Sequence, residues 1–176
     1  IWYKPASDEA LKSLLLGKSG KQYIDGIPPD EIRTDIVQDL YEEANDKLPP
    51  QLKELVEMTA QPLIQPIFDL ESQKMRNNRI VTIGDAAFTA RPHVGMGVTK
   101  AAKDAFTLSE YLDPNKFLES LNDWESSRLI EGKFIVNRSR ILGKYLSSYD
   151  ENETLEMPDV INVLKDTAIS LNDIIN

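Results

Sequence analysis

The sequence predicts a mixed α/β fold that is rich in helices, and two observations lead to this prediction. Apolar residues recur at helical spacing in several long segments, the longest of which runs from Phe117 to Leu146. A short β-branched run, Ile80-Val81-Thr82-Ile83, ends at a Gly-Asp pair and suits a strand that is buried on both faces. With 41% apolar and 28% charged residues, the 176-residue chain has the composition of a soluble globular protein.

The first part of the chain predicts short strands followed by two helices. Residues 1–27 are expected to form one or two strands around a polar turn at residues 17–20. Pro28 then begins a helix, which ends at Pro49-Pro50. A second helix follows and ends before Pro62.

The middle of the chain predicts strands at residues 67–70 and 80–83, followed by a helix from Val98 to about Leu112. This helix is expected to bury one apolar side, made of Val98, Ala101, Ala102, Ala105, Leu108 and Leu112. Its three alanines would let it approach a neighbouring element closely, and Asp113-Pro114 ends it.

The last part predicts a long amphipathic helix over residues 117–146, in one or two pieces. Trp124 is interpreted as a core residue, whereas three arginines of this helix are interpreted as surface charges: Arg128, Arg138 and Arg140. A polar linker at residues 150–156 and a final helix from Pro158 complete the chain.

Composition excludes several classes of function. A formal net charge of −9 argues against binding to nucleic acid or to an anionic membrane surface. No apolar run is long enough to cross a bilayer. The absence of cysteine is compatible with a cytoplasmic location, and with His93 as the single histidine it leaves no zinc or thiolate site. The acidic stretch at residues 150–155 has Leu155 where a calcium loop needs glycine, so no metal site is predicted.

The segment from Arg79 to Asp104 carries the strongest functional signal. A predicted strand ends in Gly84-Asp85, and a loop then leads through Gly95 and Gly97 into a helix. A helix N-terminus reached through glycines offers free N–H groups to a ligand, and the Asp85 carboxylate can accept hydrogen bonds from sugar or ribityl hydroxyls. The alternative is that these glycines only serve tight turns.

This segment resembles the second flavin-binding motif of the class A FAD-dependent aromatic-ring hydroxylases, typified by para-hydroxybenzoate hydroxylase. The matching residues are Gly84-Asp85-Ala86-Ala87, Pro92, Gly95, Gly97, Ala101-Ala102 and Asp104-Ala105. The sequence of residues 90–95 is most similar to that of hydroxylases acting on dihydroxypyridines. Phe88 and Thr99 depart from the family pattern, which often has His and Asn at these places.

The resemblance implies the C-terminal portion of an FAD-binding Rossmann-like domain together with part of a β-sheet substrate-binding domain. Residues 1–75 would belong to the substrate-binding region, 76–147 to the FAD-binding domain, and 148–176 to a C-terminal linker and helix. The Gly-x-Gly-x-x-Gly turn that holds the FAD pyrophosphate is absent, as is the family's second Asp-Gly motif. Both would lie upstream of Ile1, so an N-terminal half of the same protein is an expected partner and the fragment alone is expected to be inactive.

The resemblance also assigns roles to residues. Asp85 would bind the ribityl hydroxyls of FAD, and the backbone N–H groups of Val98 and Thr99 would face N1 and O2 of the isoalloxazine. The remaining cofactor-binding residues would be Gly84, Gly95, Met96 and Gly97. Pro92 would border the place where flavin and substrate meet. Apart from the resemblance, the place of His93 beside Pro92 and its ordinary pKa of about 6.5 suit a residue that orients a ring hydroxyl or helps to deprotonate it. The alternative for His93 is a structural role. Arg91 is expected to be solvated, with pairing to a carboxylate as the alternative.

The expected function is hydroxylation of an aromatic or N-heteroaromatic ring by an FAD-dependent monooxygenase that uses NAD(P)H and O2. One alternative is another flavin oxidoreductase of the same superfamily, such as an epoxidase or a halogenase. A second alternative is a non-catalytic helical interaction module that keeps the Gly-Asp segment. The final helix could pack on its own domain or on another subunit, which leaves a homodimer open.

Overall fold

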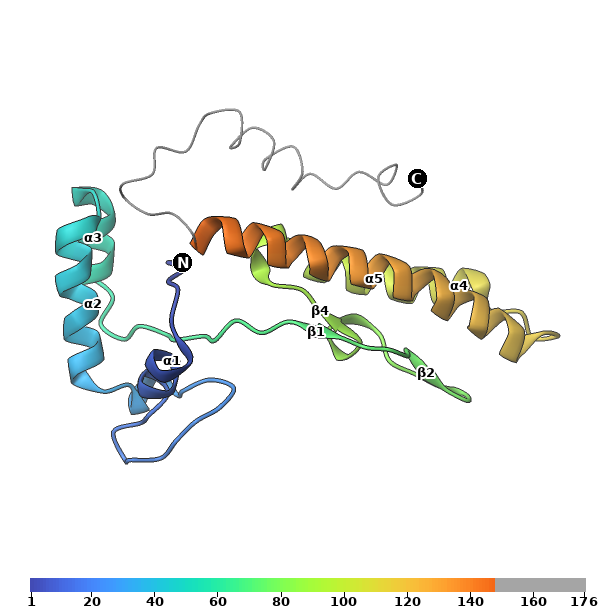
Figure 1. The fold of residues 1–176 in the computed structure, drawn as a ribbon, viewed down its shortest axis with the longest axis horizontal. Coiled ribbons are helices and arrows are strands. Elements are labelled where there is room, and N and C mark those ends of the chain that lie inside the picture. Colours follow the sequence, from blue (N-terminus) through green and yellow to red (C-terminus); the bar gives the residue numbers. More distant parts are fainter. Residues whose placement is uncertain (148–176) are drawn as a thin grey trace. The chain divides into compact units, whose positions relative to one another are not determined.

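The computed structural model describes residues 1–147, which fall into two compact units (Figure 1). The first unit is Ile1–Pro66, and the second begins at Ile67. Leu70–Glu71 belongs to the second unit, where it pairs with another strand. The predicted linker at residues 150–156 and the helix predicted from Pro158 lie outside the described residues.

The first unit begins with a helix rather than with the predicted strands. Helix α1 (Asp8–Leu14) is capped by Ser7, whose hydroxyl accepts a hydrogen bond from the Ala10 amide at 3.2 Å. The cap and the acidic first turn favour a helix locally, so the prediction of strands is wrong for these residues. The turn at residues 17–20 is confirmed, and Leu16 and Gln22 form an isolated antiparallel bridge around it.

Two helices follow, as the prolines predict. A short 3₁₀ turn, η1 (Pro29–Glu31), precedes α2 (Thr34–Lys47), so the α-helix begins later than Pro28. Helix α3 (Pro50–Glu57) has Pro50 in its first turn and lies beside α2 (Figure 1). A small core cluster of this unit is formed by Leu15, Ile27 and Ile32.

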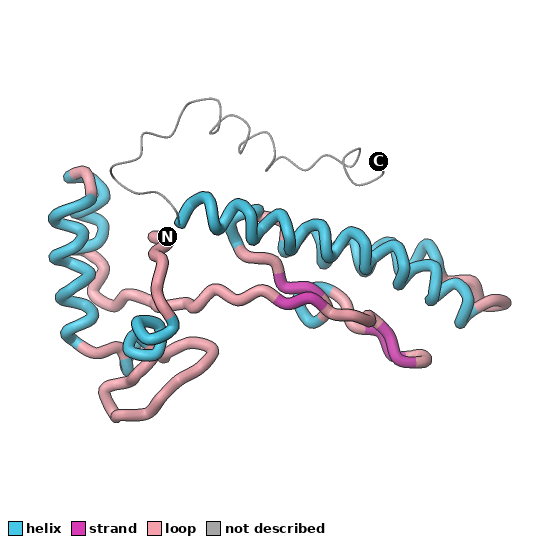
Figure 2. The backbone as a smooth tube through the Cα atoms, viewed as in Figure 1, coloured by secondary structure: helices cyan, strands magenta, loops and turns pink. Residues whose placement is uncertain are grey.

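The strands of the second unit are short and antiparallel (Figure 2). Strand β1 (Leu70–Glu71) pairs with β4 (Phe88–Thr89), and β2 (Arg76–Asn77) pairs with β3 (Ile80–Val81). The prediction of a strand buried on both faces is wrong, because residues 80–81 form one arm of a hairpin and the Ile80 side chain is 73% exposed.

Two long helices lie side by side in the second unit (Figure 1). Helix α4 (Gly97–Tyr111) has nearly the predicted bounds, and α5 (Phe117–Ser147) is one continuous helix. Trp124 of α5 is fully buried, which confirms its prediction as core. It clusters with four other buried residues, namely Met75, Ala87, Phe88 and Val136.

The buried face of α4 is not the predicted apolar side. Val98 is 85% exposed, and Ala102 and Ala105 are exposed as well. The fully buried residues of this helix are instead Lys100 and Asp104. Their polar groups have partners inside the molecule, described below, and these partners determine which side of the helix faces inward.

Within residues 1–147, none of the helices is long and apolar enough to cross a membrane.

Candidate functional site

The turn at Gly84 and Asp85 lies in a short 3₁₀ segment, η2 (Gly84–Ala86), that packs against α4. Gly84 is buried and has a φ of 61°, a conformation that favours glycine. A Cβ at this position would lie 3.2 Å from the Cβ of Ala101 on α4. Glycine is therefore needed here both for its backbone conformation and for its small size.

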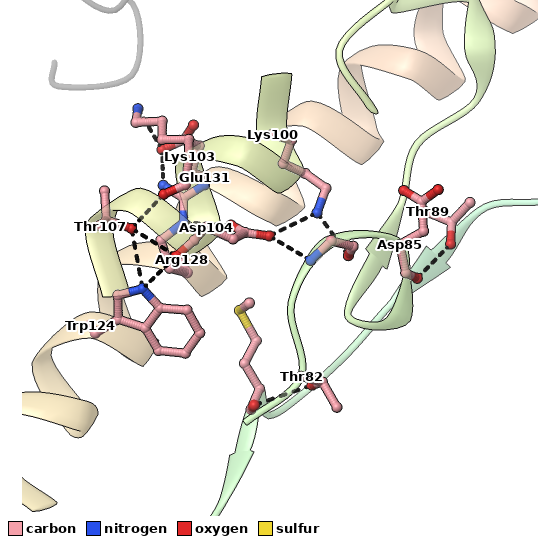
Figure 3. Close-up of polar contacts among 12 residues, drawn as sticks. Thr82, Asp85, Thr89, Lys100, Lys103, Asp104, Thr107, Trp124, Arg128 and Glu131 are labelled. Carbon is pink, nitrogen blue, oxygen red and sulfur yellow. Dashed lines mark hydrogen bonds and ion pairs between the residues drawn. The ribbon is translucent and has the colours of Figure 1, made fainter. Parts of the chain in front are cut away.

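Two charged side chains of α4 hold the peptide groups of Gly84 (Figure 3). The Gly84 amide donates a hydrogen bond to Oδ2 of Asp104 at 2.9 Å, and Nζ of Lys100 donates to the Gly84 carbonyl at 2.9 Å. Lys100 also donates to Oδ2 of Asp104 at 3.2 Å, so the three residues form a closed set of contacts.

These side chains belong to a larger group of buried charges, here called the buried cluster: Lys100, Asp104, Arg128 and Glu131. Nε of Arg128 donates to Oδ1 of Asp104 at 2.7 Å, and a terminal nitrogen of Arg128 donates to Glu131. Burial alone would raise the pKa of Glu131, but hydrogen bonds from Arg128 and Lys103 lower it below its usual value. The interpretation of Arg128 as a surface charge is therefore wrong.

Asp85 itself is exposed at the surface of the turn. Its backbone carbonyl accepts a hydrogen bond from the Thr89 hydroxyl at 2.8 Å (Figure 3). Because Gly84 is held on one side and the Asp85 carbonyl on the other, the main chain that carries this carboxylate is fixed while its side chain faces solvent.

The loop between β4 and α4 is held by α5. Its 3₁₀ turn, η3 (Pro92–Val94), begins with an exposed proline and ends at Gly95, whose φ is 63°. Val94 is buried against α5 in a small core with Ile135 and Leu142. Met96 is half-buried against the same core.

Helix α4 starts at Gly97 without a side-chain cap. Met96 at the cap position has no side-chain oxygen, so its side chain cannot accept a hydrogen bond from the first N–H groups of the helix. Val98 and Thr99 are exposed, and a Cβ on Gly97 would meet no atom within 4 Å apart from its chain neighbours and the nearby backbone of its own helix. The positive end of the helix dipole is thus accessible to a ligand.

His93 is half-buried against α5. Its ring packs over Gly143, where a Cβ would lie 2.9 Å from Cδ2 of the imidazole. Burial, and then the positive charge of Arg91, lower the pKa of His93 below its ordinary value. Both effects favour the neutral imidazole, which can accept a proton or a hydrogen bond.

A second group of charges, here called the outer cluster, joins the same loop to β1 and α5: Asp69, Glu71, Arg91 and Arg140. Nε of Arg91 donates to Asp69 at 2.8 Å, and Nε of Arg140 donates to Asp69 at 2.9 Å. The hydrogen bond from Arg140 is the largest cause of the lowered pKa of Asp69; burial opposes it and Arg91 adds to it. The expectation that Arg91 is solvated is wrong, and Arg140 is only partly a surface charge.

The structure therefore packs the turn of Gly84 and Asp85 against α4, and it places Pro92 and His93 on the adjoining loop against α5. Sequence reasoning missed the buried cluster, although Asp104 belongs to the motif. The spacing of Lys100 and Asp104, four residues apart on a helix, was the signal available.

Comparison with known proteins bears on the fold of the chain and on the proteins that it resembles. A protein family described as FAD binding domain-like matches residues 1–69. This match falls on the segment predicted to be part of the substrate-binding region, and the division of the chain between the two kinds of domain stays a prediction.

The chain is 35% identical over 95 residues to 2,6-dihydroxypyridine 3-monooxygenase of Paenarthrobacter nicotinovorans. The aligned part is 53% of this chain and 24% of that protein. The structure of 2,6-dihydroxypyridine-3-hydroxylase from Arthrobacter nicotinovorans matches with a TM-score of 0.73 and 26% identity. This second match covers 84% of the chain and 38% of the solved one, so the chain spans well under half of either relative.

The similarity in fold confirms the predicted mixed, helix-rich α/β class. The pattern at residues 84–105 and these comparisons lead to one conclusion: in sequence and in fold, the chain resembles part of an FAD-dependent aromatic-ring hydroxylase.

Proposed function

We propose that this chain is part of an FAD-dependent monooxygenase that hydroxylates an aromatic or N-heteroaromatic ring with NAD(P)H and O2. The observation that carries the proposal is the exposed carboxylate of Asp85 on a turn that packs against α4, a helix whose first turn is uncapped. This arrangement occurs in a chain whose fold matches that of a dihydroxypyridine hydroxylase. The chemical class of that relative makes an electron-rich hydroxylated ring the proposed substrate.

The residues at this place suit a flavin. The Asp85 carboxylate can accept hydrogen bonds from ribityl hydroxyls because it is exposed and its main chain is fixed. The backbone N–H groups of Val98 and Thr99 lie in the first turn of α4, where the helix dipole favours negative charge. Gly97 leaves open space for close approach to the backbone. Gly84, Gly95 and Met96 would shape the surrounding turns.

Bound FAD would supply the redox chemistry, and the protein would position the substrate and exclude water. His93, whose neutral form is favoured by burial and by Arg91, is the proposed group that orients a ring hydroxyl or takes its proton. Pro92, exposed beside it, would border the substrate. This role for His93 competes with a purely structural one, since its ring packs on Gly143.

The proposal extends to the rest of the protein. The sequence contains no Gly-x-Gly-x-x-Gly turn to hold a pyrophosphate, and the chain corresponds to 38% of the solved relative. We therefore propose that a preceding part of the same protein completes the flavin site. A cytoplasmic location is proposed from the absence of cysteine.

Replacing Asp85 with Ala in the full-length protein tests the cofactor assignment. Loss of a hydrogen-bonding carboxylate should weaken FAD binding roughly tenfold or more. Bound flavin is measured by the visible absorption of the purified protein, and affinity by titration of the apoprotein. Asp123→Ala, which removes an exposed carboxylate from α5, is the matched control. A folded Asp85→Ala variant with unchanged flavin affinity would contradict the assignment.

Substrate turnover separates the neighbouring enzyme classes. The full-length protein is expected to consume NAD(P)H and O2 and to hydroxylate dihydroxypyridines or phenols. Intact flavin reduction combined with no product from hydroxylated arenes or N-heterocycles would favour an epoxidase or a halogenase.

A further inference from the structure

Charged side chains replace the usual backbone partners of Gly84. Main-chain N–H and C=O groups in a buried turn must find hydrogen-bond partners, and these are most often other backbone groups. Here the Gly84 amide donates to Asp104 and the Gly84 carbonyl accepts from Lys100, and each hydrogen bond is 2.9 Å long. Lys100 and Asp104 are each only 1% exposed. The two side chains lie one helical turn apart on α4, and together they bind the N–H and the C=O of the same residue, Gly84.

Stability alone does not explain these buried charged side chains, because burying them costs free energy. Burying charges carries a desolvation penalty that close pairing offsets only in part, and packed apolar residues often stabilise a core equally well. Directional contacts, in contrast, fix geometry. Arg128 keeps Asp104 oriented, since its Nε binds Oδ1 at 2.7 Å and leaves Oδ2 for the Gly84 amide.

Gly84, which these two side chains bind, directly precedes Asp85. The Gly84 carbonyl belongs to the same peptide plane as the Asp85 amide, so the lysine contact sets the orientation of that plane. The Thr89 hydroxyl holds the following carbonyl at 2.8 Å. The direction in which the Asp85 carboxylate leaves the surface is therefore set by contacts on both sides, one of which depends on the buried cluster.

We propose that Lys100 and Asp104 are positioning residues that aim Asp85 at its ligand. The inference rests on the proposed function, in which Asp85 binds hydroxyl groups of FAD. Neither side chain needs to touch the cofactor, because both are buried beneath the turn. They act through the Gly84 peptide groups.

A double-mutant cycle in the full-length protein tests this inference. Lys100→Met keeps the length of the side chain but removes its donor, and it should weaken FAD binding roughly tenfold through loss of a hydrogen bond to a charged group. In the Asp85→Ala background, the same substitution should have almost no further effect on FAD affinity, because the carboxylate that it aims is gone. Lys133→Met, at an exposed position of α5, is the control and should leave affinity unchanged in both backgrounds.

Each outcome is decisive. If Lys100→Met lowers FAD affinity equally with and without Asp85, the lysine has a general structural role and the inference fails. If a folded Lys100→Met variant binds FAD normally, the inference also fails. If Asp85→Ala alone leaves FAD affinity unchanged, the proposed function fails first, which separates the two claims.

Asp104→Asn provides a second route if Lys100→Met does not fold. It preserves shape while removing the charge, and the same cycle with Asp85→Ala applies. Hydrogen exchange of the Gly84 amide can also be measured in the unmodified protein. The amide should exchange slowly, as a buried donor to a carboxylate does. Rapid exchange would show that Asp104 does not hold the Gly84 amide and would overturn the inference.

Discussion

The buried cluster and the outer cluster use the same residue type on the same helix in opposite environments. Arg128 of α5 binds Asp104, and the two side chains are 1% and 2% exposed. Arg140 of α5 binds Asp69, and these side chains are 40% and 13% exposed. Both arginines tie α5 to a segment of the candidate site: the first through α4 and the Gly84 turn, the second beside the loop that carries His93.

This difference shows how the surroundings of an ion pair determine its worth. At the outer cluster, water screens the charges and the side chains lose conformational freedom on pairing, so the net stabilisation is small. At the buried cluster, removal of one partner leaves another charge buried without full compensation, which is strongly destabilising. The two clusters should therefore respond very differently to equivalent substitutions.

The largest effect is expected from Arg128→Met. The substitution keeps much of the apolar stem but deprives Asp104 and Glu131 of their shared partner. Unfolding free energy, measured by urea denaturation, should fall by about 3 to 5 kcal/mol. Lys133→Met on the exposed side of α5 is the control, with a change within about 0.5 kcal/mol. A loss at Arg128 as small as that of the control would show that the buried cluster is not tightly coupled.

Arg140→Met should have a much smaller effect. Its guanidinium is partly solvated, and Arg91 remains bound to Asp69 after the substitution. The expected loss of unfolding free energy is below about 1 kcal/mol, after allowance for solvent screening. Raising the salt concentration should shrink this loss further. A loss as large as that at Arg128 would remove the distinction between the clusters.

The smallest effect concerns pH and His93, which lies beside Arg91. Since burial and Arg91 lower the pKa of His93 in the folded state, the unfolded chain binds its proton more readily. The contribution to stability is thus present above the ordinary histidine pKa and is lost as the pH falls through that value toward the lower folded one. His93→Asn should flatten the dependence of unfolding free energy on pH in this range. An unchanged slope would mean that His93 titrates alike in both states.

Periodicity and proline placement were enough to predict four helices. The prolines mark the limits of α2 and α3, and the apolar spacing marks α4 and α5. The helix at residues 8–14 was not predicted, because the apolar and aromatic residues of this region were interpreted as strands and Ser7 was not recognised as a cap. The β-branched run at Ile80 was misjudged because residue type does not reveal on how many sides a strand is covered.

The candidate site was foreseen only in part. The positions of Gly84, Asp85 and Gly97 agree with the motif, and the exposure of Asp85 suits a ligand-binding role that stays a proposal. The orientation of α4 was mistaken because charged residues are normally exposed, so Lys100 was not expected to face inward. Only the three-dimensional positions of Gly84 and Arg128 explain that reversal.

The alanine at position 101 takes on a different meaning in this arrangement. Its Cβ is the atom that a side chain at position 84 would meet, at 3.2 Å. Ala101 therefore acts as a spacer that sets how near the Gly84 turn can come to the helix. Enlarging this spacer would lift the turn from α4, stretch the contacts to Lys100 and Asp104, and move the Asp85 carboxylate outward. Because position 84 already requires glycine for its backbone conformation, the limit on size falls on position 101, where related proteins with this turn should keep a small residue.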